Sequence, residues 1–184
     1  FSLKKRKKKQ IKFIVFHYTG MISENNAINR LTKIQSTVSS HYFIKKNGDI
    51  IKMVPESYIA WHAGISKWGK YTFLNKNSIG IEISNSGHMF KYENFSNNQI
   101  KSLISLSKKL IKEYKINKKC ILGHSDIAPD RKLDPGEKFP WQTLAKHQIG
   151  FWHNLSKKRL NVLRKNKVSS REKKLFMQKL KKIG

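Results

Sequence analysis

The sequence has only one cysteine, Cys120, and it lies inside a short apolar run. An intrachain disulfide is therefore excluded, and the thiol is interpreted as buried and inert rather than as a nucleophile. No apolar run reaches the roughly 18 residues that a membrane-spanning helix needs, so the sequence predicts no such helix. The chain also opens at Phe1 without an initiator methionine, and we expect a processed or trimmed form from which any signal peptide is missing.

Acidic residues are scarce as well, with 11 Asp and Glu against 39 Lys and Arg, for a net charge of +28. Residues 1–12 carry +7 and residues 151–184 carry +11, so only +10 belongs to the rest of the chain. Such charge favours an anionic partner surface, which could be a membrane, a cell wall or nucleic acid. The alternative is a lysine-rich composition whose charges are merely solvated, and the sequence leaves both open.

The charge and the apolar patterning divide the 184 residues into three parts. Residues 1–10 are predicted to be a flexible basic arm, because an unbroken charge run cannot bury a core. Residues 11–150 are long enough for one folded domain. Residues 151–184 are predicted to form a basic extension of two amphipathic helices, with a break near residues 168–172.

The most informative stretch is the loop that runs from Gly123 to Gly136. It follows a short apolar strand, and it carries His124, Lys132 and Asp134. Histidine and aspartate are zinc ligands, and a lysine beside them can stabilise an oxyanion. The simpler alternative is a histidine at the strand end followed by an Asp-Pro-Gly turn.

A second strand, residues 11–17, also ends in a histidine, His17. If the two strands lie side by side in one sheet, His17 and His124 meet at the same edge. Asp134 would then complete a three-ligand site with one open position, which is the arrangement of a catalytic zinc rather than a structural one.

Glu82 lies in the apolar strand 78–84, on the face opposite Ile79 and Ile81. A lone acid in a central strand is costly to bury unless it is paired or functional, whereas on an edge strand it would face water. Beside a zinc site it would be a natural general base.

Local patterns predict the remaining elements. Ser23 caps a helix over residues 25–35 whose Ile34 faces inward, and Ser96 caps the clearest helix, residues 97–114. Residues 41–46 and 50–54 form a hairpin through an Asn-Gly-Asp turn. Residues 57–77 form a long loop of the kind that is usually functional. The strand at residues 120–123 is placed at the centre of the sheet.

Five segments resemble, in order, the zinc N-acetylmuramoyl-L-alanine amidases of the type-2 family, and most closely their AmiD-like branch. They are FHYT (16–19), SSHYFI (39–44), WHAG (61–64), SIGIEIS (78–84) and GHSDIAPDRKLDPG (123–136). The resemblance covers residues 11–150 and implies an α/β fold with a central mixed β-sheet flanked by helices, shared with peptidoglycan recognition proteins and phage T7 lysozyme. Asp130 departs from the glycine that many relatives have there, which bears on the conformation of the loop.

The resemblance implies one Zn²⁺ held by His17, His124 and Asp134, with Glu82 as general base and Lys132 supporting the oxyanion. Four residues are predicted to bind substrate: Trp61, His62, His41 and Asn85. The family places His62 near the substrate and not on the metal. For His41, a second interpretation is a half-buried strand histidine that orients its neighbours.

The implied activity is cleavage of the amide between N-acetylmuramic or anhydro-muramic acid and L-alanine in peptidoglycan or muropeptides, by a monomer in the periplasm or cell envelope. A cytoplasmic location is the alternative. Two other classes stay open: a non-catalytic peptidoglycan receptor of the same fold, and a basic protein that binds nucleic acid or a membrane surface. No recognised nucleic-acid motif supports the last class.

Overall fold

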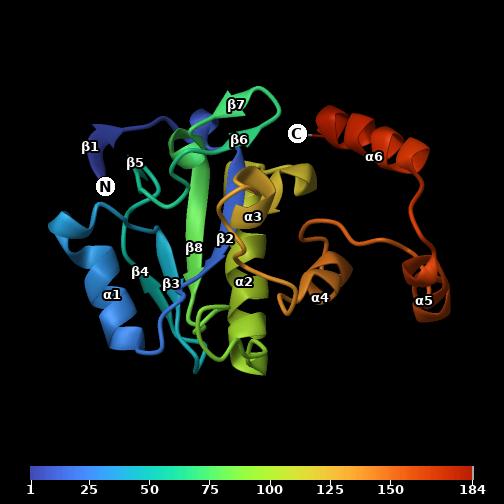
Figure 1. Cartoon of the computed structure of the whole chain (residues 1–184). Coiled ribbons are helices and arrows are strands. Elements are labelled where there is room, and N and C mark those ends of the chain that lie inside the picture. Colours follow the sequence, from blue (N-terminus) through green and yellow to red (C-terminus); the bar gives the residue numbers. More distant parts are fainter. Residues whose placement is uncertain (184) are drawn as a thin grey trace.

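The computed structural model describes residues 1–183, and the side chains up to residue 179. It has the predicted α/β architecture, a mixed five-stranded sheet flanked by helices (Figure 1). The strands follow in spatial order as β4 (Ile50–Lys52), β3 (Tyr42–Ile44), β8 (Ser78–Ile83), β2 (Phe13–Tyr18) and β9 (Ile121–Gly123).

The register of the parallel strands positions the site. β2 pairs in parallel with β8 on one side and with β9 on the other, while β3 and β4 form the predicted antiparallel hairpin. His17 lies opposite Glu82, and Phe16 lies opposite Gly123, the residue before His124. The predicted meeting of the two histidine-bearing strands is therefore confirmed. The predicted central place of residues 120–123 is wrong, because within the described residues β9 pairs with β2 alone and forms an edge of the sheet.

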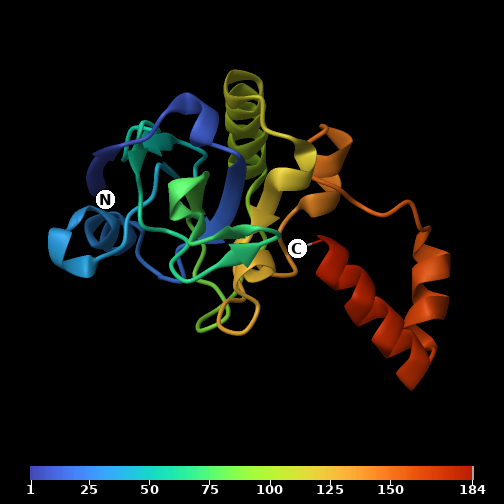
Figure 2. The same ribbon diagram turned by 90° about the horizontal axis from the view of Figure 1, so that it is seen from above.

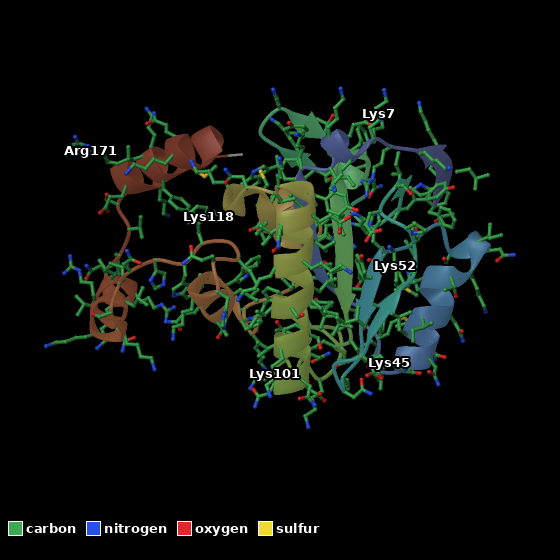
Figure 3. All side chains as sticks on the ribbon, turned by 180° about the vertical axis from the view of Figure 1, so that it is seen from behind. Lys7, Lys45, Lys52, Lys101, Lys118 and Arg171 are labelled. Atoms are coloured by element: carbon green, nitrogen blue, oxygen red, sulfur yellow. The ribbon has the colours of Figure 1, made fainter. Side chains whose placement is uncertain are left out.

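One face of the sheet is apolar and packs on a long helix. Ile14 and Phe16 of β2, with Ile79, Ile81 and Ile83 of β8, belong to a single buried cluster. Helix α2 (Asn97–Tyr114) contributes Leu103, Leu106 and Leu110 to that cluster. Figures 2 and 3 show α2 along this face. The period-two alternation of the strands thus sends the intervening residues to the other face.

Helix α2 begins where its capping residues predict. The Ser96 hydroxyl accepts a hydrogen bond from the Gln99 backbone N–H, and the Gln99 side chain accepts one from the Ser96 N–H. Such a capping box satisfies two donors that the first helical turn would otherwise leave free.

The opposite face of the sheet is covered by residues 57–77, and this segment is not the long structureless loop that its composition predicts. It contains four short elements: β5 (Tyr58–Ile59), β6 (Lys67–Trp68), β7 (Tyr71–Thr72) and η3 (Leu74–Lys76). Ala63 and Leu74 pack against Phe13 and Val15 of β2. On this face of β8, Ser78 is buried and Glu82 is half-buried.

Helix α1 (Glu24–Thr32) is shorter than predicted. Ser23 caps it as expected, accepting a hydrogen bond from the Asn26 N–H. The helix ends at Lys33, whose backbone is extended, and a short 3₁₀ turn, η2 (Ile34–Ser36), follows. Ile34 is 88% exposed, so its predicted inward position is wrong because the helix that would have turned it inward has already ended.

The prediction of a flexible arm over residues 1–10 is also wrong. β1 (Ser2–Lys5) pairs with β5, and a 3₁₀ turn, η1 (Lys8–Gln10), leads into β2. Arg6 lies between β1 and η1, and it is only 6% exposed. Its side chain donates hydrogen bonds to the carbonyls of Glu56, Asn75 and Ser78. Burial lowers the pKa of Arg6 to about 10, which still leaves it charged at neutral pH. One basic residue of the run is therefore part of the core.

The C-terminal part forms two basic helices with a break between them, as predicted. After α4 (Trp141–Lys146) the chain continues into α5 (Lys157–Lys165) and α6 (Ser170–Ile183), on the side of the molecule away from α1 (Figures 1 and 2). The apolar side chains of Leu163, Leu175 and Phe176 are exposed. Those of Leu180 and Ile183, part of the predicted apolar pattern, lie outside the described residues. No described helix is long and apolar enough to cross a membrane.

Arg6→Met tests whether the N-terminal segment is part of the fold. The change leaves three buried carbonyls without their donor, so we expect the free energy of unfolding to fall by about 2–4 kcal/mol. Urea denaturation of the metal-free protein measures it. The matched control is Lys9→Met, since Lys9 is exposed and should leave stability unchanged. If the two variants were equally stable, the result would instead support the prediction that residues 1–10 form a flexible arm.

Candidate metal centre

Three predicted ligands lie together at the carboxyl ends of β2 and β9. Nδ1 of His17, Nδ1 of His124 and Oδ2 of Asp134 form a triangle in which each pair of atoms is 3.0 Å apart. All three residues are buried. Among the described residues, no other group of three His, Cys, Asp or Glu side chains has the arrangement of a metal site.

The triangle has the dimensions that a tetrahedral zinc requires. Ligand bonds of 2.0–2.1 Å at tetrahedral angles place the donor atoms about 3.3 Å apart. Two imidazole nitrogens that approach to 3.0 Å need a shared cation or a proton between them, and the adjacent carboxylate supplies negative charge. The donor set of two histidines and one aspartate therefore fits a zinc site with an open fourth position.

The electrostatics of the cluster favour a cation. The pKa of His17 falls to about 4, mainly because the ring is buried; the neighbouring His124 acts in the same direction, and Asp134 opposes it. Burial alone would raise the pKa of Asp134, but the close contacts with Nδ1 of His124 and His17 bring it below its ordinary value. At neutral pH the site thus offers a neutral His17 and an ionised carboxylate, the protonation states that bind metal.

Local backbone geometry brings Asp134 to the histidines. The Ser125 N–H donates to the Asp134 carbonyl at 2.8 Å, which ties the far end of the loop to the start of helix α3 (His124–Ile127). A Cβ at Gly123 would lie 2.6 Å from Cδ of Pro135. Glycine is therefore needed at the end of β9 so that the loop can approach closely enough for Asp134 to reach the site.

Glu82 reaches the same cavity from β8, one strand away from His17. Its Oε2 is buried and has no hydrogen-bond partner within the described part of the chain. Burial raises the pKa of Glu82 well above its ordinary value, and the charge of Asp134 adds to this, while Lys132 and Arg30 oppose it. A carboxyl with an elevated pKa and a free oxygen is suited to accept a proton and return it.

Lys132 lines the cavity together with the three ligands. In the described residues it forms no salt bridge with Asp126 or Asp130, the partners that a purely structural role would require. Asp126 instead accepts a hydrogen bond from the Gly123 N–H. The ammonium of Lys132 is therefore available to a group in the cavity.

The cavity has a volume of about 410 Å³, and it is open to solvent. Trp61 and His62, two of the predicted substrate-binding residues, lie in its wall. Several further lining residues are not among the predicted site residues: Tyr18, Arg30, His88, Met89 and Leu133. The position of His88 in a polar loop favours a surface or packing role, but its Nδ1 lies 2.8 Å from the Tyr18 hydroxyl at the cavity rim.

The other two predicted substrate-binding residues are not on the cavity. His41 is 0% exposed, and its Nδ1 accepts a hydrogen bond from the Gly80 N–H, so its role is to support neighbouring strands. Asn85 is buried as well, and its side chain bridges the Glu93 carbonyl and the Gly87 N–H. In this structure the polar atoms of both side chains are engaged within the fold and neither side chain lines the cavity, so their contact with substrate stays a prediction.

The segment that contains the residues of this cavity is similar to known proteins. A family model described as N-acetylmuramoyl-L-alanine amidase matches residues 7–137. N-acetylmuramoyl-L-alanine amidase AmiD of Escherichia coli (strain K12) is 44% identical over 155 residues, which are 78% of this chain and 55% of AmiD. The 1,6-anhydro-N-acetylmuramyl-L-alanine amidase AmpD of Haemophilus influenzae is 40% identical over 109 residues, 59% of this chain and 57% of AmpD. The chain thus spans little more than half the length of these relatives.

Two solved structures share the fold. E. coli AmiD, in complex with the substrate anhydro-N-acetylmuramic acid-L-Ala-D-gamma-Glu-L-Lys, superposes with a TM-score of 0.74 at 40% identity, covering 86% of this chain and 65% of AmiD. AmpDh3 of Pseudomonas aeruginosa, in complex with anhydromuramic pentapeptide, gives a TM-score of 0.76 at 30% identity and covers 94% of this chain and 74% of its own.

The metal site gives a direct prediction. We expect one Zn²⁺ per chain, removable by a strong chelator, and we expect His17→Ala and Asp134→Ala to lose tight zinc binding because each removes one of three ligands. Metal content after dialysis measures this. Asp130→Ala, in the same loop but outside the triangle, is the control and should bind zinc as the wild type does. Full zinc occupancy in Asp134→Ala would assign the third ligand to another side chain.

Proposed function

The chain belongs to the N-acetylmuramoyl-L-alanine amidase family, in its AmiD-like branch, and on that premise we propose that it hydrolyses the amide bond between muramic acid and L-alanine. The substrate class is peptidoglycan or the muropeptides released from it, and the reaction serves turnover of the cell wall. The observation that carries the proposal is that one open cavity holds His17, His124 and Asp134 together with Glu82 and Lys132.

The residues of the cavity divide the work of amide hydrolysis. Zn²⁺ bound by His17, His124 and Asp134 would act as a Lewis acid and lower the pKa of water toward 7. Glu82 accepts the proton of the attacking water and returns a proton to the leaving amine of L-alanine. Lys132 places positive charge where the amide oxygen becomes an oxyanion. Burial of the ligands keeps these charges in a low dielectric, where they act more strongly than in water.

We include soluble anhydro-muropeptides among the substrates. Two relatives with the same fold are known in complex with anhydro-muramyl peptides. The cavity of this chain is open at its mouth, and Trp61 and Leu133 supply apolar surface there. Mass spectrometry of the products from purified sacculi and from soluble anhydro-muropeptides tests the range of substrates. Release of free stem peptides beginning with L-alanine is expected from both, and their absence from both would contradict the proposed reaction.

A non-catalytic receptor of the same fold is the main competing function, and the cavity argues against it. A receptor needs neither a complete set of metal ligands nor a buried, unpaired carboxylate oxygen such as that of Glu82, which is costly to keep without a catalytic use.

The basic C-terminal helices are proposed to hold the enzyme on an anionic wall or membrane surface. Several of their described apolar residues, including Leu163, Leu175 and Phe176, are exposed, and the two helices carry much of the charge found outside the matched family segment. Basic side chains also spread over the rest of the molecule, as the labelled residues in Figure 3 show. Charge on α5 must therefore be compared with equal charge elsewhere.

A matched pair of triple variants makes that comparison. Changing Lys157, Lys158 and Lys165 of α5 to Gln should weaken sedimentation with sacculi, with less effect as salt rises, since Debye screening weakens exposed charges. Changing Lys101, Lys108 and Lys109 of α2 to Gln removes the same charge and should have a smaller effect. Turnover of a soluble muropeptide should stay unchanged in both. If the two variants sedimented equally, binding to sacculi would depend on the overall charge of the protein and not on α5 in particular.

Variants of Glu82 and Lys132 test the catalytic assignment. Neither residue is a ligand, so Glu82→Gln and Lys132→Ala should bind zinc normally. Loss of the general base should lower kcat by about 10²–10⁴. Loss of the oxyanion support should lower kcat by about 10²–10³. Lys132→Arg should rescue only part of it, because guanidinium is not a compact ammonium.

Two measurements separate these effects from damage to the fold. The kcat is measured at saturating zinc, beside the melting temperature of each variant. Glu113→Gln, an exposed carboxylate-to-amide change on α2, is the control and should be neutral. A Lys132→Ala enzyme with normal kcat but a lower melting temperature would make Lys132 a structural residue.

A further inference from the structure

The two candidate histidine ligands are held from behind by two consecutive residues, His62 and Ala63. Nε2 of His17 lies 3.0 Å from Nδ1 of His62, and Nε2 of His124 lies 3.2 Å from the carbonyl oxygen of Ala63. In both ligands the ring nitrogen that faces away from the triangle is therefore engaged. A neutral imidazole has one N–H, so the partner of one nitrogen decides whether the other is free to bind a metal.

On the His17 side, the direction of the hydrogen bonds is set by a carbonyl at the far end. The Ser78 hydroxyl lies 2.6 Å from the Leu74 carbonyl, which can only accept, so Ser78 donates there. The Ser78 oxygen then accepts from Nε2–H of His62, 3.1 Å away. Nδ1 of His62 is consequently unprotonated, and it accepts from Nε2–H of His17.

The His124 side ends at a carbonyl directly. Because the Ala63 oxygen can only accept, Nε2 of His124 carries the proton, and its Nδ1 is left with a lone pair. The Arg131 guanidinium donates to the same oxygen at 2.7 Å and also to the Ile65 carbonyl, which holds the Ala63 peptide in place.

Two further contacts keep His62 and Ala63 where they are. The Asn75 side-chain oxygen accepts hydrogen bonds from the backbone N–H groups of His62 and Ala63, at 3.1 and 2.7 Å. The His62 ring lies directly over Gly80 of β8, where an added Cβ would come within 2.3 Å of its Cγ. A glycine in the middle of a strand normally weakens it, so its presence here indicates a close approach that a side chain would block.

We propose that His62 and the Ala63 carbonyl select, before any metal arrives, the tautomer in which Nδ1 of both His17 and His124 can bind a cation. His62 is then a positioning residue and not a substrate contact, although it lies in the cavity wall. Partners of this kind, behind the ligands, orient the rings and raise metal affinity. The proposal rests on the proposed zinc-dependent function, but it concerns metal binding alone.

Three variants separate the hydrogen bond from the volume of the ring. His62→Leu fills much of the space but removes the acceptor, so zinc affinity should fall by about 10- to 100-fold. His62→Asn places its side-chain oxygen near the former Nδ1, and it should recover most of that affinity. Ser78→Ala frees the tautomer of His62 while keeping its ring, and it should give a smaller loss. Trp61→Leu, beside them in the cavity wall, is the control and should bind zinc as the wild type does.

Zinc affinity is measured by competition with a chelator, without substrate, beside the melting temperature of each metal-free variant. Nuclear magnetic resonance of ¹⁵N-histidine in the zinc-loaded protein adds a direct readout. The Nε2 proton of His17 should be protected from exchange in the wild type and in His62→Asn, and exposed to exchange in His62→Leu.

The outcomes distinguish this proposal from the proposed function. Equal zinc affinity in the wild type, His62→Leu and Ser78→Ala would overturn the positioning role and leave the amidase intact. Equal losses in His62→Leu and His62→Asn would also overturn it, because the ring itself and not its acceptor would then matter. A wild type that binds no zinc but cleaves muropeptides would overturn the metal site and this proposal together, and a wild type that binds zinc but cleaves nothing would overturn only the proposed activity.

Discussion

The arrangement of this face of the protein depends on three donor atoms that lie close together. Without a cation between them, these atoms repel one another or compete for a proton. Two imidazole nitrogens and one carboxylate oxygen, each 3.0 Å from the others, are held in a buried place with little water to screen them. Parallel pairing of β2 with β9 brings in the two histidines, and the absent side chain at Gly123 lets the loop of Asp134 close over them. The remaining features of this face keep the three atoms in place.

The sheet separates stability from chemistry by its two faces. Ile79, Ile81 and Ile83 pack toward α2, while Ser78, Gly80 and Glu82 alternate with them on the other side. The residues of the second set have distinct roles, since Ser78 holds the His62 ring, Gly80 makes room for it, and Glu82 reaches the cavity. A change of one residue in register would exchange the two sets, so the site and the core constrain the strand together.

The basic residues play different parts at the two ends of the chain. Arg6 is buried and hydrogen-bonded to three backbone carbonyls, so it contributes to the fold. The lysines of α5 and α6 that the structure describes are exposed beside exposed apolar residues, a pattern suited to an anionic surface. Net charge alone does not distinguish these roles, because it counts buried and solvated groups equally.

The sequence by itself determined the elements whose signals are local. The capping box of α2, the hairpin turn, the alternation in β8 and the two histidines at strand ends each depend on residues a few positions apart, and together with the family motifs they indicated the three ligands, Glu82 and Lys132. Tertiary structure alone decided that His62 and Ala63 contact the two candidate histidine ligands, that Arg6 enters the core, that His41 and Asn85 lie off the cavity, and that β9 is an edge. These outcomes depend on contacts between residues as far apart as 72 positions for Arg6 and Ser78, or 61 for Ala63 and His124. The packing of the whole chain determines which residues meet at such separations. The local patterns of the sequence, such as the spacing of apolar residues, therefore do not reveal these hydrogen bonds.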